Sequence, residues 1–63
     1  MMEQFTWGDT VRVRSDAPEE NRPGSMGSVC GLPDPRRDDD DQYLVEFSDG
    51  HSIQIHGPML EAV

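Results

Sequence analysis

The chain has 63 residues, of which 33% are hydrophobic, and Cys30 is its one cysteine. This length allows a single domain, residues 1–63, with a thin core, and a lone cysteine excludes an internal disulfide. Thirteen acidic residues against five arginines give a net charge of −8, which disfavours nucleic acid and other phosphate-rich partners.

The first predicted element is a half-buried strand over residues 10–14, TVRVR. Val11 and Val13 share one face, and the threonine and the two arginines share the other, which is the period of two that strands show. The Trp7-Gly8-Asp9 stretch before it is typical of a turn. Residues 1–4 are expected to fray.

Two long loops flank a short second strand. Residues 15–26 hold two prolines, a glycine and several charges, so they favour a loop that the prolines stiffen. The strand is expected over residues 27–31, with Val29 facing the core and Cys30 facing away unless a bulge intervenes. Residues 32–41 contain two further prolines and four consecutive aspartates, a pattern that indicates a solvated loop.

A β-hairpin gives the strongest signal in the chain. Residues 42–47 (QYLVEF) and 51–56 (HSIQIH) both show the alternation of strands, and Asp49-Gly50 between them is typical of a tight turn. Residues 59–61 are expected to form one helical turn, and residues 62–63 a last short strand.

These elements predict an all-β fold: a small SH3-like antiparallel barrel of about five short strands, with one 3₁₀ turn near the C-terminus. A short antiparallel sheet must curl and close to bury its apolar face and its edges. The inward-facing strand positions predict the core, with Phe5 or Trp7 as a lid. The predicted core residues are Val11, Val13, Val29, Tyr43, Val45, Phe47, Ile53, Ile55 and Leu60.

A series of short motifs runs along the chain: F-x-x-G-D-x-V-R-V-R at residues 5–14, R-P at 22–23, Y-x-V-x-F at 43–47, I-x-I at 53–55 and L-E at 60–61. This series resembles the SH3-like C-terminal domain of the nitrile hydratase beta subunit and, more loosely, other small accessory-subunit barrels. The resemblance implies a non-catalytic subunit packed against a metal-bearing alpha subunit. It also places Arg22 where the family has an arginine that reaches towards oxidised cysteine ligands of that partner. The loop that carries Arg22 is shorter here and lacks the family's neighbouring histidine and aromatic residues.

The sequence offers no catalytic or metal-binding set. His51 and His56 are an odd number of strand positions apart, so they are expected on opposite faces, where they cannot share a metal. The run 38–41 lacks the spaced oxygen ligands and the turn glycine of a calcium loop. Cys30 has no adjacent base that would activate its thiol. We therefore expect no enzyme activity, no catalytic residue, no metal and no cofactor.

The function that the sequence favours is that of a non-catalytic protein–protein interaction or accessory module. Its partner is expected to be another protein or a second copy of the chain, and no small-molecule substrate is evident. The predicted contacts combine aromatic, arginine and methionine side chains, which are enriched at such surfaces, with one outward leucine. They are Trp7, Arg12, Arg14, Arg22, Leu44 and Met59.

Two alternatives stay open. In the first, the acidic loop imitates a phosphate backbone, and the chain inhibits a nucleic-acid-binding protein. In the second, the barrel itself binds nucleic acid weakly, as KOW-type barrels do, which requires Arg12, Arg14 and Arg22 to cluster rather than pair with Glu46 and other acids. Because the chain has no long apolar run, no signal-peptide pattern and no disulfide, we expect a soluble cytoplasmic protein without a membrane segment.

Overall fold

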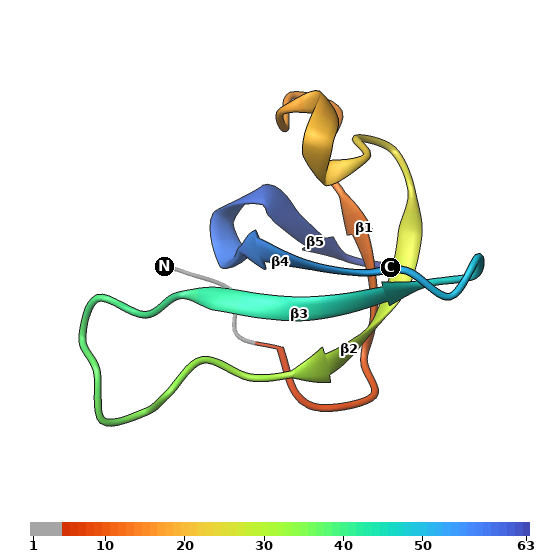
Figure 1. Ribbon diagram of the computed structural model, residues 1–63. Coiled ribbons are helices and arrows are strands. Elements are labelled where there is room, and N and C mark those ends of the chain that lie inside the picture. Colours follow the sequence, from red (N-terminus) through yellow and green to blue (C-terminus); the bar gives the residue numbers. More distant parts are fainter. Residues whose placement is uncertain (1–4) are drawn as a thin grey trace.

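The computed structural model describes residues 5–63, so the expected fraying of residues 1–4 lies outside the described part. Within it, the chain forms one antiparallel sheet of five strands and two 3₁₀ turns, which confirms the predicted all-β class (Figure 1). The strands are β1 (Thr10–Val13), β2 (Met26–Gly31), β3 (Gln42–Phe47), β4 (Ser52–His56) and β5 (Leu60–Ala62), and the turns are η1 (Glu19–Asn21) and η2 (Gly57–Met59).

The sheet curls because its two edge strands are joined by a very short connection. In the order β4-β3-β2-β1-β5, strands β4 and β5 lie at opposite ends, which in a flat sheet would be about 19 Å apart at ~4.8 Å per strand. Yet only the three residues of η2 separate them in sequence, and a 3₁₀ turn of that length rises by about 6 Å. The two edges therefore approach each other at this corner, as the predicted barrel requires (Figure 1).

The C-terminal elements begin two residues earlier than predicted. The turn η2 replaces the helical turn expected over residues 59–61, and β5 replaces the strand expected over 62–63. Pro58 suits the first positions of a helical turn because its φ is fixed and no N–H is needed there. Leu60 is then free to pair with Val13 as a strand residue and to face the core.

The loop predicted over residues 15–26 is more structured than expected. It contains η1, so the described chain has two 3₁₀ turns where the sequence predicted one. Met26 pairs with Arg12 and already belongs to β2. Because η1 contacts β4 and Ala17 is buried, this loop folds back over the barrel.

The core lies inside the barrel and differs from the prediction in two side chains. Ile53 is only half-buried at the core's edge, and Ala17 is an unpredicted member. Phe5, not Trp7, is the lid: its ring meets Tyr43 edge-on with centroids 5.4 Å apart, and its N–H donates to the Tyr43 hydroxyl oxygen. The buried apolar residues are Phe5, Val11, Val13, Ala17, Val29, Tyr43, Val45, Phe47, Ile55 and Leu60.

A bulge re-aims the end of β2. Val29 pairs with Val45, but the next pair is Gly31 with Leu44, so Cys30 is the extra residue. The Cys30 side chain is half-buried. Leu44 packs directly onto Gly31, where an added Cβ would lie 2.8 Å from the Leu44 Cβ. The missing side chain leaves the outer face of the sheet hollow at this point.

Candidate functional site

Trp7 is the most exposed large apolar side chain of residues 5–63, at 72%. It holds the second position of a tight turn. The Asp9 N–H donates to the Thr6 carbonyl oxygen (3.0 Å), and the Thr6 N–H donates to the Asp9 carboxylate (2.8 Å). Gly8 has a φ of 92°, as the third position of a type II turn requires. The tryptophan is thus presented on a turn closed by two hydrogen bonds.

The turn is fixed to the barrel next to the end of β2. The Gly8 N–H donates to the Val29 carbonyl oxygen at 2.7 Å, and the Val29 N–H donates to the Asp9 carbonyl oxygen at 2.9 Å. The turn and β2 accordingly lie side by side in Figure 1. Since Phe5 is anchored on Tyr43, the backbone on both sides of Trp7 is held while the indole stays in solvent.

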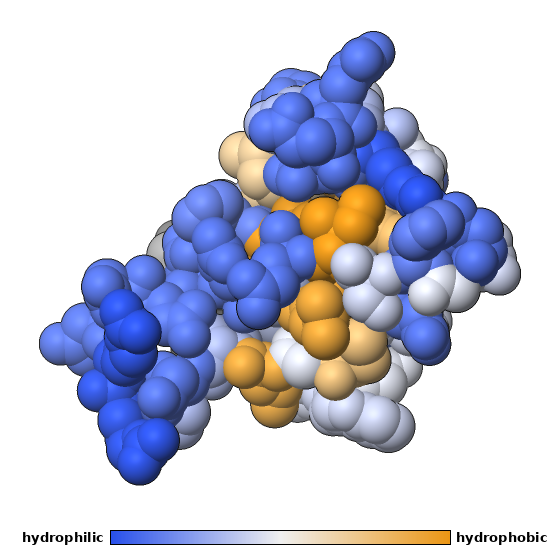
Figure 2. All heavy atoms as spheres, in the orientation of Figure 1, coloured by the Kyte–Doolittle hydropathy of each residue, from blue (hydrophilic) through white to orange (hydrophobic). Residues whose placement is uncertain are grey.

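Leu32 adds apolar surface near the same end of β2. It is 53% exposed and lines a shallow hollow of about 300 Å³ with Phe5, Pro33 and Tyr43. In the orientation of Figure 1, apolar side chains form a band between the polar lobe of the β2–β3 loop and the polar lobe around η1 (Figure 2). The polar loops therefore frame, rather than cover, the apolar part of this face.

Four of the five arginines form ion pairs with aspartates. Arg12 forms no ion pair with a described residue, and Glu46 pairs with none of the arginines. The predicted set of Arg12, Arg14 and Arg22 is therefore not a free cationic patch. The pairs are Arg14–Asp16 (3.1 Å), Arg22–Asp49 (2.9 Å), Arg36–Asp34 (3.2 Å) and Arg37–Asp39 (3.3 Å).

Arg22 forms its contacts with other residues of the same chain. Besides its ion pair with Asp49, its guanidinium carbon lies 5.1 Å from the centroid of the Phe47 ring, a cation–π contact. Its φ of 59° is the one positive value at a described residue other than glycine, a conformation that carries strain. These contacts tie the β1–β2 loop to the β3–β4 hairpin.

The remaining predicted contacts fall into two groups. Arg14 is engaged within the chain, and so is Met59, which packs against the core from η2. Arg12 lies on the outer face between Met26 and Glu61, its partners on the neighbouring strands. Leu44 is half-buried on the outer face of β3. Trp7, Arg12 and Leu44 are thus the predicted contacts that have no ion-pair or core role.

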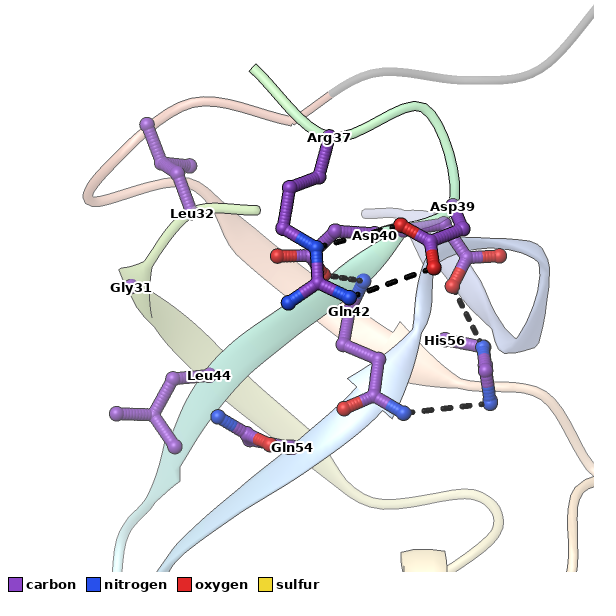
Figure 3. Close-up of a pocket in the computed structure, with 10 residues that line it drawn as sticks. Gly31, Leu32, Arg37, Asp39, Asp40, Gln42, Leu44, Gln54 and His56 are labelled. Carbon is purple, nitrogen blue, oxygen red and sulfur yellow. Dashed lines mark hydrogen bonds and ion pairs between the residues drawn. The ribbon is translucent and has the colours of Figure 1, made fainter. Parts of the chain in front are cut away.

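A groove of about 480 Å³ lies on the outer face of β3 and β4, beside the β2–β3 loop. Figure 3 shows Leu32 and Leu44 along one side of it and Arg37, Gln42 and His56 along the other. Gly31 has no side chain that would fill the groove from below, so the groove stays open at this point. The groove therefore joins the apolar surface of Leu32 to a polar wall.

Hydrogen bonds hold the wall of the groove in place. The His56 Nδ1 lies 2.6 Å from the Asp41 Oδ1, and the Gly57 N–H donates to the Asp41 carbonyl oxygen at 2.8 Å. The Asp40 carboxylate accepts the N–H groups of Asp34 (2.9 Å) and Gln42 (3.3 Å). These two backbone donors hold the pKa of Asp40 below its usual range. The loop is thus shaped before any partner arrives.

His51 immediately precedes β4 and His56 is its last residue, and each lies beside an aspartate: His51 beside Asp49 and His56 beside Asp41. Within residues 5–63, no three His, Cys, Asp or Glu side chains are grouped to hold a metal ion. In that same part of the chain, no helix has the length and apolar character to cross a membrane.

Asp49 predicts a pH dependence of stability. The His51 ring (Nδ1 to Oδ2 3.0 Å), the His51 N–H and the Arg22 guanidinium hold the pKa of Asp49 well below its ordinary 3.8. A lowered folded-state pKa means that this stabilisation is complete above about pH 4 and decreases as the pH falls through the lowered pKa. We expect carbon-detected NMR to show Asp49 titrating at a lower pH than an unperturbed aspartate, and Asp49→Asn to flatten the acid side of the stability curve. An ordinary titration of Asp49 would contradict this.

Comparisons with protein-family models, with curated proteins and with solved structures found no match to this chain. The resemblance to the nitrile hydratase beta subunit therefore stays a prediction from the motifs. Sequence reasoning also missed Leu32, which lies in the loop predicted as solvated. The available signal was a leucine between a strand-ending glycine and a proline.

Proposed function

We propose that this chain is a non-catalytic protein-interaction module, of the accessory type, that binds a protein partner through the surface around Trp7. The observation that carries the proposal is a tryptophan 72% exposed on a turn whose backbone is bonded to the barrel. Tryptophan is enriched among the side chains that dominate binding energies. A turn that is already ordered loses little freedom on binding, which lowers the entropic cost of association.

The barrel closes without Trp7 because Phe5 fills the lid position. Burying a large apolar side chain contributes about 1.5–3 kcal/mol, and this thin-cored chain forgoes that gain at its one tryptophan. A role for the indole outside the fold accounts for its position.

The change Trp7→Ala is expected to remove partner capture from an extract of the protein's own cells, with affinity falling by about 30-fold or more. The free energy of unfolding, measured with urea, should change by no more than ~0.5 kcal/mol, because the indole contributes little to the core. Met26→Ala is the matched control, since Met26 is an exposed apolar side chain elsewhere on the barrel. If the original chain, Trp7→Ala and Met26→Ala all capture the partner equally, the contact lies away from Trp7.

A second copy of the chain is one form that the partner can take. As the one tryptophan, Trp7 makes intrinsic fluorescence a probe of this site. Self-association through Trp7 shifts its emission to the blue as protein concentration rises, in step with the mass measured by sedimentation. An emission maximum that is independent of concentration assigns the surface to a different protein.

A second candidate function, an acidic imitation of nucleic acid, is favoured by the pairing of the arginines. Because aspartates neutralise four of them, the outward field is that of the remaining acids, which also argues against nucleic-acid binding by the barrel itself. A complex held by this field dissociates in 1 M salt, where charges are screened beyond ~3 Å. A complex anchored by Trp7 persists there.

A further inference from the structure

The groove beside the β2–β3 loop has two unlike sides. Leu32 and Leu44 offer aliphatic surface on one side, and carboxylates of the loop line the other (Figure 3). An extended peptide presents successive side chains in opposite directions. A segment in which two kinds of side chain alternate therefore matches this groove better than a helix or a compact ligand does.

The charge of the groove selects a cation. Asp39, Asp40 and Asp41 line it against one arginine, Arg37, which Asp39 pairs at 3.3 Å. The hydrogen-bond partners of the other two carboxylates are backbone N–H groups and the His56 ring. Each carboxylate has about four lone-pair sites, so acceptor capacity is left over. A guanidinium fits such acceptors through paired hydrogen bonds.

The floor of the groove adds an amide. Gln54 stands opposite Leu44 on the neighbouring strand, and its side chain forms no hydrogen bond with a described residue. An amide side chain offers both a donor and an acceptor to a passing peptide group. The Gln54 amide can therefore form hydrogen bonds with the main chain of an extended segment whose side chain packs on Leu44.

We propose that this groove binds an extended segment of a protein partner in which arginine and aliphatic residues alternate. The arginines face the carboxylates of residues 39–41, and the aliphatic side chains lie on Leu44 and Leu32. This inference rests on the proposed function only in that the partner is a protein.

The test is an NMR titration of the full chain with the capped pentapeptide Arg-Leu-Arg-Leu-Arg. Saturable shifts are expected at Leu44, at the Gln54 side-chain amide and at Asp41, and the capped peptide Glu-Leu-Glu-Leu-Glu should cause none. Gln54→Lys places a competing cation in the groove and should weaken binding by about tenfold or more. Ser28→Lys makes the same charge change at an exposed strand position outside the groove, and should weaken binding by less than about threefold.

The groove assignment is overturned by no shifts at the groove residues, by equal weakening by the two lysine variants, or by equal binding of the glutamate peptide. Shifts confined to the residues around Trp7 overturn it as well. The titration is independent of partner capture by Trp7→Ala, so a failed groove and a failed Trp7 surface are told apart.

Discussion

Replacing Ile55 with alanine is expected to lower the free energy of unfolding by about 2–5 kcal/mol. Ile55 is the largest of the fully buried side chains, with 1% of its surface exposed. A domain of this size has a total stability of roughly 3–9 kcal/mol, so Ile55→Ala removes a large share of it. Urea unfolding followed by circular dichroism should show a transition displaced strongly to lower urea, or a chain unfolded at 25 °C.

Gln54→Ala is the matched control for that loss. Gln54 precedes Ile55 on β4 and points to solvent, so its truncation should change stability by no more than ~0.5 kcal/mol. Equal effects of the two substitutions would mean that the faces of β4 are misassigned, since a one-residue slip in register exchanges inside and outside.

The inward faces of the strands were readable from the sequence because alternation carries the information locally. The barrel's lid was not. Phe5 and Trp7 are both aromatic and lie in an irregular segment, where no period marks one of them as inward. The choice depends on Tyr43, 38 residues away from Phe5, which accepts a backbone N–H and packs against the phenyl ring. Such a contact exists only once the chain has folded.

The charged contacts also divide into those between sequence neighbours, which the sequence can predict, and those between distant segments, which it cannot. Three arginines pair with an aspartate two positions away, a spacing visible in the sequence. The contacts Arg22–Asp49 and His56–Asp41 join loops to the hairpin, and no local pattern predicts them. The groove likewise follows from a bulge that brings Gly31 opposite Leu44. The sequence allowed a bulge near Cys30 but could not say that it would open a groove.

Replacing Gly27 with alanine is the second substitution with a large expected effect on stability, and the direction of that effect tests the packing of β2 against β3. Gly27 lies in β2 with its open side towards the core, paired between Val11 and Phe47. A Cβ added there would lie 2.7 Å from the Glu46 carbonyl oxygen and 2.7 Å from the Val45 Cγ1. The first atom is backbone and the second belongs to a side chain with 0% exposure, so neither can move away cheaply.

Gly27→Ala is therefore expected to destabilise the fold by about 1–3 kcal/mol, the usual effect of overpacking. This is opposite to the gain of about 0.4–1 kcal/mol that the substitution brings where the backbone accepts it. Each kcal/mol should lower the melting temperature by about 4–8 °C in a domain of this size. Ser28→Ala, one residue further on the outer face, should leave the melting temperature nearly unchanged. A Gly27→Ala chain that melts higher than the original would show that β2 and β3 are further apart than the barrel requires.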